Sequence, residues 1–310
     1  MTEIKKNTLL KRMWKGRTGY LFLLPLMIGV ICFAYYPPIL AIVKSFTDWS
    51  SASSGSVIGF GNYKELFHDQ VFLDSIPTML ILSIPSLIIS IFVPLVMAEL
   101  IYHVACGKMK SLYRVLVLLP IIAPGVIGTY IWTFIYQQDG GLLNGLLNAV
   151  GIHSEINWLN DSRYVLFSMI FMGFPWVGGT NVLIYMSGLM DISTEVIEAA
   201  RLDGAGTMRI IRSIHMPALV GQIRYFAVFG IIGAFQNYGM QVILSNSGKV
   251  DPDITNSAIM VPGYYMYQQA FKHGRMGYAC AIGTLLFAFV GLLTLLTFKV
   301  FKAKRLDLDE

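Results

Sequence analysis

The sequence predicts an all-α membrane protein that crosses the bilayer about six times. Of its 310 residues, 55% are hydrophobic and only 13% are charged, which is about half the charged fraction of a typical soluble domain. The apolar residues gather in six runs, each long enough for a membrane-spanning helix. Most lysines and arginines lie at the ends of these runs, on one side of the resulting topology. Composition, run length and charge placement therefore all indicate the same fold class.

The six apolar runs have approximate bounds that can be read directly from the sequence. They are residues 20–43, 75–101, 112–136, 164–190, 219–244 and 278–301. The first follows a basic segment, as a signal peptide does, but it is longer than a signal h-region and lacks a small-residue cleavage site, so we interpret it as a retained helix. Prolines such as Pro25, Pro85 and Pro120 interrupt several runs, and such kinks suit helices that line a path.

These bounds predict a basic cytoplasmic segment over residues 1–19, a transmembrane domain over 20–301 and a cytoplasmic tail over 302–310. Placing both termini inside leaves six of the 23 lysines and arginines outside. Those six are Lys44, Lys64, Arg163, Lys249, Lys272 and Arg275. The excess of cations inside favours this orientation. Because the cations flank apolar runs and form no single basic face, the net charge of +5 does not indicate a nucleic-acid partner.

A polar island of about 25 residues separates the fourth run from the fifth. Ser193 is a candidate N-cap for a short first helix, and Gly204 and Gly206 break that helix because glycine tolerates a left-handed turn. Thr207 can cap a second short helix, which we expect Pro217 to end. The island is therefore predicted to form a compact helical hairpin beside the membrane.

The spacing Glu198-Ala199-Ala200, Gly204, Ile214 and Pro217 resembles the EAA loop of ABC importer permeases. The resemblance implies that the hairpin faces the cytoplasm and that its short helix sits in a cleft of the ATP-hydrolysing subunit. The family's final Leu-Pro is here Met216-Pro217, a mild departure because methionine is also flexible and apolar. The residues that the resemblance assigns to coupling are Glu198, Ala199, Ala200, Asp203, Gly204, Ile214 and Pro217.

Further landmarks occur in the order typical of carbohydrate-type ABC permeases. They are the segments 19–25, 36–37, 59–63, 118–120, 198–206 and 271–277. The chain is most similar to the first permease subunit of maltose, multiple-sugar and glycerol-phosphate importers, although it lacks a large outer-loop insertion. The resemblance implies a multi-pass protein of the bacterial cell membrane. It also implies a homologous second permease, two ATP-binding subunits, an extracellular solute-binding protein and a sugar substrate. ATP and magnesium would bind to the ATPase subunits, and this chain would hold no cofactor.

Two polar clusters interrupt the fourth and fifth runs and are candidates for the substrate path. They comprise Trp176, Gly178, Asn181, Gln236, Asn237 and Tyr238. Polar groups are costly in lipid and normally face a partner or a cavity. Amides both donate and accept hydrogen bonds to hydroxyls, and an aromatic face packs on a sugar ring. The alternatives are hydrogen bonds between helices for the amides and an interfacial anchor for Trp176.

Catalysis by this chain is not expected. The sequence has no Gly-x-x-x-x-Gly-Lys-Ser/Thr loop for ATP. Its five histidines are scattered without metal-ligand spacing, and its three cysteines lie far apart, so we expect no metal site and no disulfide framework.

Three alternatives remain: a glycerol-phosphate or polyol permease of the same architecture, a stand-alone secondary transporter, and an intramembrane enzyme. Secondary transport would require an ionisable group at mid-membrane for ion coupling. Glu99 is the main candidate, and its place near the end of a run favours an interfacial position. A permease of the ABC class, in contrast, requires a separate ATPase.

Overall fold

The computed structural model describes residues 17–153 and 155–300, and the regular secondary structure of these residues is helical. They form two compact units, one of residues 17–66 and 269–284 and the other of residues 67–268 and 285–300. The basic residues before Arg17, the tail over 302–310 and the side of the membrane predicted for each terminus lie outside the described residues.

In the first unit, the first apolar run forms one long helical segment. It consists of α2 (Arg17–Gly29), the π-helical η1 (Val30–Tyr35) and α3 (Tyr36–Lys44). Together they make a candidate membrane span. The chain stays helical through Pro37 and Pro38, which lie in the first turn of α3, where a missing backbone N–H costs little. The wider π-helical turn before them accommodates the change in hydrogen bonding.

The rest of the first unit is α4 (Gly61–Leu66), most of η3 (Gln268–Lys272) and the start of α18 (Met276–Val300). Asn62, which is buried, donates from Nδ2 to the carbonyls of Ser45 and Thr47, both at 2.8 Å. Glu65 on α4 forms an ion pair with Arg275 at 2.6 Å. The Asn62 hydrogen bonds fix α4 to the end of the first span, and the ion pair with Arg275 fixes α4 to a residue far away in the sequence.

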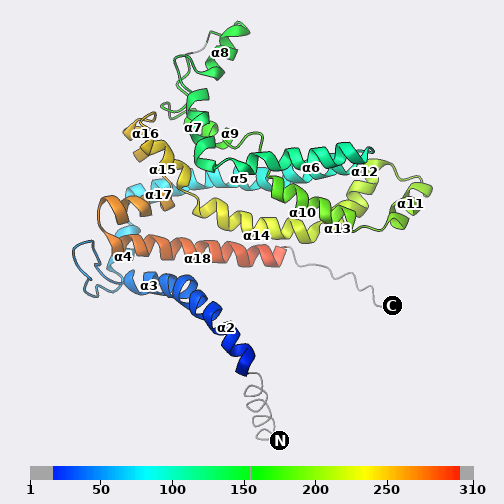
Figure 1. The fold of residues 1–310 in the computed structure, drawn as a ribbon. Coiled ribbons are helices and arrows are strands. Elements are labelled where there is room, and N and C mark those ends of the chain that lie inside the picture. Colours follow the sequence, from blue (N-terminus) through cyan, green and yellow to red (C-terminus); the bar gives the residue numbers. More distant parts are fainter. Residues whose placement is uncertain (1–16, 154, 301–310) are drawn as a thin grey trace, which may run out of the picture. The chain divides into compact units, whose positions relative to one another are not determined.

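Four helices of the second unit pack side by side: α5 (Gln70–Tyr102), α6 (Gly107–Ile122), α10 (Gly179–Met190) and α14 (Val220–Gln236) (Figure 1). Asp69 caps α5 by accepting hydrogen bonds from the backbone N–H groups of Val71 and Phe72. The core between the four helices is apolar. Its most buried members are Ala98, Val182, Tyr185, Met186, Leu189 and Leu219.

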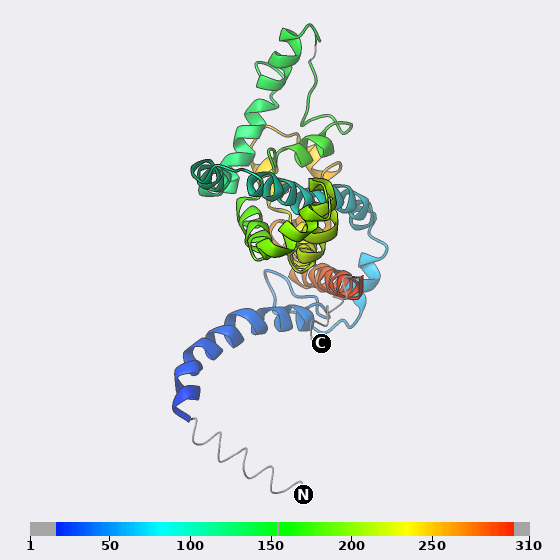
Figure 2. The same ribbon diagram turned by 90° about the vertical axis from the view of Figure 1, so that its right-hand side faces the viewer.

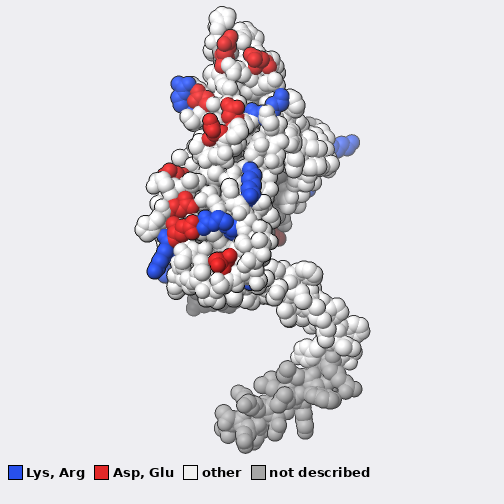
Figure 3. Space-filling view, turned by 90° about the vertical axis from the view of Figure 1, so that its left-hand side faces the viewer, with Lys and Arg blue, Asp and Glu red and all other residues white. Residues whose placement is uncertain are grey.

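The other elements of the second unit extend this bundle toward the end away from the polar island. They are α7 (Gly125–Ile135), α8 (Leu142–Ala149), α9 (Val165–Phe171), α15 (Gly239–Asn246), α16 (Pro252–Asn256) and α17 (Pro262–Tyr267). All of these except α17 contribute to a second apolar core around Val165, Leu244 and Ile259. Exposed acidic side chains, seen on the face in Figure 3, mark this end of the unit. They are Asp139, Glu155, Asp251 and Asp253.

The predicted all-α membrane fold is confirmed, but the described residues contain four or five candidate spans where about six were predicted. Four helical segments qualify as membrane spans by length and composition, at residues 18–44, 70–102, 220–246 and 276–299. The third run becomes a fifth candidate if α6 and α7, which are bent by 85°, count as one span. The fourth run, expected to be continuous, is divided into α9 and α10. Pro175 cannot continue a helix, and Trp176 and Gly178 have φ angles of +52° and +54°, so the backbone turns left-handed there.

Candidate functional site

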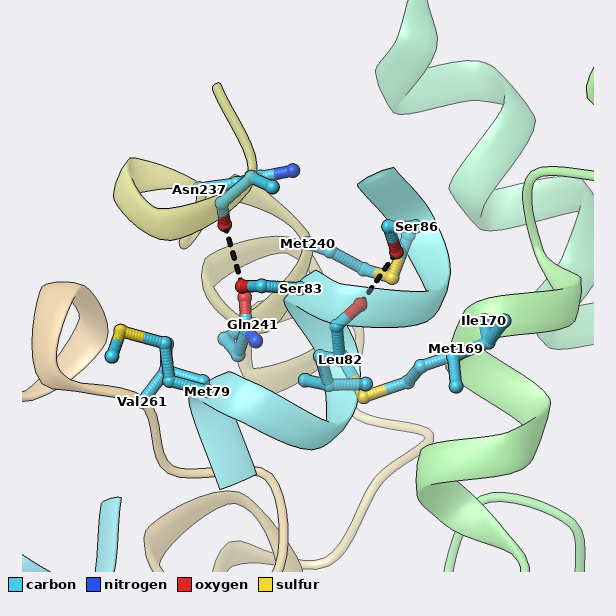
Figure 4. Close-up of a pocket in the computed structure, with 11 residues that line it drawn as sticks. Met79, Leu82, Ser83, Ser86, Met169, Ile170, Asn237, Met240, Gln241 and Val261 are labelled. Carbon is cyan, nitrogen blue, oxygen red and sulfur yellow. Dashed lines mark hydrogen bonds between the residues drawn. The ribbon is translucent and has the colours of Figure 1, made fainter. Parts of the chain in front are cut away.

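Two adjoining cavities lie within the second unit, between α5, the break in the fourth run and the break between α14 and α15. The first has a volume of about 80 Å³, and Ser83, Asn237 and Gln241 are among its lining residues (Figure 4). The second has a volume of about 290 Å³ and is lined by residues that include Trp176 and Asn181. Both cavities share a wall of Ser86, Met169, Ile170 and Met240. Every residue that lines them is uncharged.

The indole of Trp176 is held in place at the edge of the second cavity. Its Nε1 donates to the carbonyl of Ile170 at 3.1 Å, and its ring packs edge-on against Phe171 and Phe174 at centroid distances of 4.9 and 5.2 Å. Asn181, in the first turn of α10, donates from Nδ2 to the carbonyl of Ser90 at 3.3 Å. One amide group is thereby fixed to α5, and an aromatic ring lies at the same cavity.

Asn237 lies where α14 stops, in an extended conformation, and its Oδ1 accepts a hydrogen bond from the N–H of Gly239 at 3.1 Å. Ser83 donates from Oγ to the carbonyl of Ala234 at 2.9 Å and so ties α5 to the last turn of α14. Gln241 on α15 is 3% exposed and faces the first cavity. The amides therefore flank a second helix break, opposite the break at Trp176.

The structure thus brings together four of the six predicted path residues. Trp176, Gly178 and Asn181 line the second cavity and Asn237 lines the first, whereas Gln236 is exposed and lines neither. Tyr238 also lies outside both cavities and packs near Tyr267, with the ring centroids 6.0 Å apart. The serines of α5 also line the cavities and were not predicted. Ser83, Ser86 and Ser90 recur every three or four residues, and this spacing places them on one helix face.

The polar island folds as a helical hairpin, which faces the viewer in Figure 2. Its elements are α11 (Thr194–Leu202), α12 (Thr207–Ile210), η2 (Ile211–His215) and α13 (Met216–Ala218). Ser193 occupies the N-cap position of α11, without a side-chain hydrogen bond. Gly204 has a φ of +79° and makes the left-handed turn that its residue type predicts.

Two details of the second half of the hairpin were predicted wrongly. Gly206, and not Thr207, is the N-cap of α12. Pro217 does not end the helix, because it lies in the first turn of α13, directly after the π-helical η2. The wider π-helical turn before Pro217 accommodates its missing N–H, so the chain continues through it toward α14.

The hairpin presents a mixed surface of charged and apolar side chains. Glu198, Ala199 and Asp203 are exposed, and Ala200 and Ile214 are half-buried. Leu202 and Met208 are also exposed, at 89% and 60%. On the opposite side, Ile197 and Ile210 are buried. Exposed apolar groups ringed by charges on a small helical projection are typical of a surface that docks against a protein.

A buried polar contact joins the base of the hairpin to α5. Glu99 lies in the last turn of α5, and its Oε1 is 3.0 Å from Nδ1 of His215, the last residue of η2. Glu99 is 8% exposed and His215 is 0% exposed, so Glu99 packs inside the unit. His103, the C-cap residue of α5, places Nε2 at 3.7 Å from the other oxygen of Glu99. This contact links residues 116 positions apart, which is why sequence spacing does not reveal it.

Comparisons with known proteins agree with this architecture. The family described as "Binding-protein-dependent transport system inner membrane component" matches residues 71–305. "Probable ABC transporter permease protein YurN" of Bacillus subtilis (strain 168) is 31% identical, over 91% of this chain and 95% of that protein. "Arabinooligosaccharides transport system permease protein AraP" of the same organism is 27% identical, over 92% and 89% of the two chains.

The fold is also found in a solved structure, a bacterial alginate ABC transporter in complex with an alginate pentasaccharide-bound periplasmic protein. The matching chain superimposes with a TM-score of 0.83 at 22% identity, covering 94% of this chain and 96% of that chain. With most of the sequence matched by one family, and the helical architecture matched over nearly its whole length, the chain belongs to the inner membrane component family of binding-protein-dependent transport systems, the non-catalytic permease subunits of ABC transporters.

Proposed function

We propose that the chain forms half of the translocation path of an ABC importer for a carbohydrate, specifically an oligosaccharide. The observation that carries this proposal is the pair of uncharged cavities lined by one tryptophan, two asparagines, a glutamine and three serines. Amide and hydroxyl groups match the hydroxyls of a sugar, and an indole packs on the apolar face of a sugar ring. A phosphate ester would call for a cationic partner, so the uncharged lining favours a neutral sugar over the glycerol-phosphate alternative.

The names of the relatives support the same substrate class. Besides the arabinooligosaccharide permease, they include a diacetylchitobiose uptake permease of Streptomyces coelicolor and a multiple sugar-binding transport permease of Streptococcus mutans. We propose that this chain pairs with a homologous permease, two ATP-binding subunits and an extracellular solute-binding protein, with both termini in the cytoplasm. ATP and magnesium then bind to the ATP-binding subunits.

In the same proposal, the hairpin over residues 193–217 docks into the ATPase. The exposed Glu198, Ala199 and Asp203, together with the apolar Leu202 and Met208, form the docking surface. Because α11 follows α10 after a connection of only three residues, and α10 begins at the second cavity, movement of the hairpin reaches the cavity through one helix.

The experiment is uptake by the complex reconstituted in liposomes, with labelled oligosaccharides and labelled glycerol phosphate offered separately. We expect Trp176→Ala and Asn237→Ala to lower oligosaccharide uptake about 5–12-fold, since each lost sugar contact is worth about 1–1.5 kcal/mol. Gln236→Ala is the matched control, because this neighbouring amide is exposed and lines neither cavity. If the three variants transport alike, the cavities are not the sugar path, and uptake of glycerol phosphate alone would select the other substrate class.

A further inference from the structure

Three potential metal ligands converge where the hairpin meets the bundle. Glu99 lies in the last turn of α5, and His103, four residues later, is the C-cap of that helix, so the two side chains lie on the same side of the helix end. His215 closes the π-helical η2, and π-helical turns are frequent at functional sites. One ligand atom from each of the three residues lies within 4.8 Å of the other two. We call these three residues the Glu-His-His cluster.

The spacing of the cluster fits a tetrahedral zinc ion. Two ligand atoms bound to zinc at about 2.0–2.1 Å in tetrahedral geometry are about 3.4 Å apart. Oε2 of Glu99 lies 3.1 Å from Nδ1 of His215 and 3.7 Å from Nε2 of His103, so the two distances bracket that value. The third pair, the nitrogens of the two histidines, lies within 4.8 Å, so closing the site requires the imidazoles to approach each other by up to about 1.4 Å. Imidazole and carboxylate ligands suit zinc, whereas magnesium and calcium prefer oxygen ligands alone.

The surroundings favour a cation with access from one side. The cluster lies at the C-terminal end of α5, where the unpaired carbonyls of a helix of 33 residues carry partial negative charge. The side chains of Glu99 and His215 are 10% and 1% exposed, while that of His103 is 36% exposed and so opens the cluster to solvent. Arg201 lines the neighbouring cavity, and its positive charge disfavours a bound cation. The negative charge of the Glu99 carboxylate offsets this repulsion.

A cavity of about 340 Å³ next to the cluster can supply the remaining ligand. It is lined by His103 and His215 together with residues of the hairpin. Nε2 of His215 is buried, and it has no hydrogen-bond partner among the described residues. A buried polar atom without a partner calls for a water or an ion. A water in this cavity can fill the fourth position on the metal, and another can accept the N–H of His215, as outer partners of metal-bound histidines do.

We propose that Glu99, His103 and His215 bind one Zn²⁺ ion, with water as the fourth ligand. The ion connects the end of α5 to the second half of the hairpin, so zinc fixes how the hairpin is held on the bundle. Without zinc, the same residues form a hydrogen-bonded contact between Glu99 and His215, which leaves His103 less constrained. This proposal stands independently of the substrate and of the partner subunits.

The test uses the full chain, purified with its partner subunits through a tag without histidines and placed in lipid nanodiscs. Co²⁺ is titrated as a spectroscopic substitute for Zn²⁺, because four-coordinate Co²⁺ has intense visible absorption bands. Zn²⁺ affinity follows from displacement of Co²⁺ and from competition with a chelating dye. The variant is His103→Ala, which removes an exposed side chain outside the core, and His153→Ala is the control because it removes an exposed histidine at the other end of the unit.

We expect the wild type and His153→Ala to bind one more equivalent of Co²⁺ than His103→Ala does, with bands of a four-coordinate ion. Loss of an outer partner of a metal ligand costs about 10–100-fold in affinity, so loss of the His103 ligand should weaken Zn²⁺ binding at least about 100-fold. Glu99→Gln keeps the volume of the side chain and should weaken binding likewise. If the wild-type complex binds no more Co²⁺ than His103→Ala, the proposal is overturned and the cluster is a hydrogen-bonded contact alone.

Discussion

Replacing Gly204 by alanine isolates the conformation of the hairpin turn from its packing. At a φ of +79°, a Cβ on residue 204 would meet no heavy atom within 4 Å, so alanine introduces no clash. The cost is the left-handed backbone itself, about 1–2 kcal/mol for a residue with a side chain. That energy corresponds to a factor of about 5–30 in the population of the turn. We therefore expect Gly204→Ala to weaken binding of the ATPase subunit by about 5–30-fold.

The assay measures the affinity of the ATPase for nanodisc-embedded permease, together with uptake and ATP hydrolysis stimulated by the binding protein. Gly248→Ala is the matched control, since Gly248 has a φ of +66° and equally open surroundings but lies outside the hairpin. Gly204→Asn should fall between wild type and alanine, because asparagine tolerates the left-handed region better. Equal ATPase affinities for the Gly204→Ala and Gly248→Ala complexes would refute the docking of this turn.

Three further predictions concern the docking charge, the helix packing and the topology. Glu198→Lys reverses an exposed charge on α11 and should release the ATPase or uncouple hydrolysis from uptake, measured by subunit retention and stimulated ATPase activity. Gly179→Ala would place a Cβ 2.1 Å from the backbone oxygen of Val117, so α10 must move away from α6, and thermal unfolding should show a loss of roughly 1–3 kcal/mol. In a cysteine-free background, Ser54→Cys should react with an impermeant thiol reagent in intact cells, and Thr207→Cys should not.

Each of these predictions has a control in the same chain. Glu155→Lys reverses an exposed charge at the far end of the second unit and should leave the ATPase bound. Gly233→Ala, on α14, meets no atom within 4 Å and should stabilise the helix slightly, so a loss equal to that of Gly179→Ala would contradict the packing argument. Both cysteine positions are exposed in the structure, so reaction at residue 207 from outside would reverse the predicted topology.

The helical fold could be predicted because burial in lipid leaves a continuous apolar signal in the sequence. The division of the fourth run was not predicted, because the run stays apolar through Gly173, Pro175 and Gly178, and these breakers were interpreted as part of one span. The continuation of the helix through Pro217 depends on the π-helical turn before it, and hydropathy does not register such a turn.

The same distinction holds for the candidate site. The asparagines and the tryptophan could be found because polar groups within apolar runs are rare. The contribution of α5 could not be found in this way, because serines are common in membrane helices and satisfy themselves on their own backbone, as Ser86 does on the carbonyl of Leu82. The contact between Glu99 and His215 could not be found from the sequence either, because the two residues are brought together only by the fold.

Gly179 lies against the backbone of α6, so this end of α10 can act as a pivot for the helix. Its 12 residues span about 18 Å, with Gly178 and Asn181 at one end and the hairpin beyond the other. With the end near Gly179 pressed against the backbone of α6, a tilt of about 10° sweeps the hairpin end through about 3 Å, while the cavity end turns almost in place. In the proposed complex, a movement of the hairpin would therefore reach the cavity as a rotation of its lining residues, and Asn181, two residues after Gly179, would turn with it.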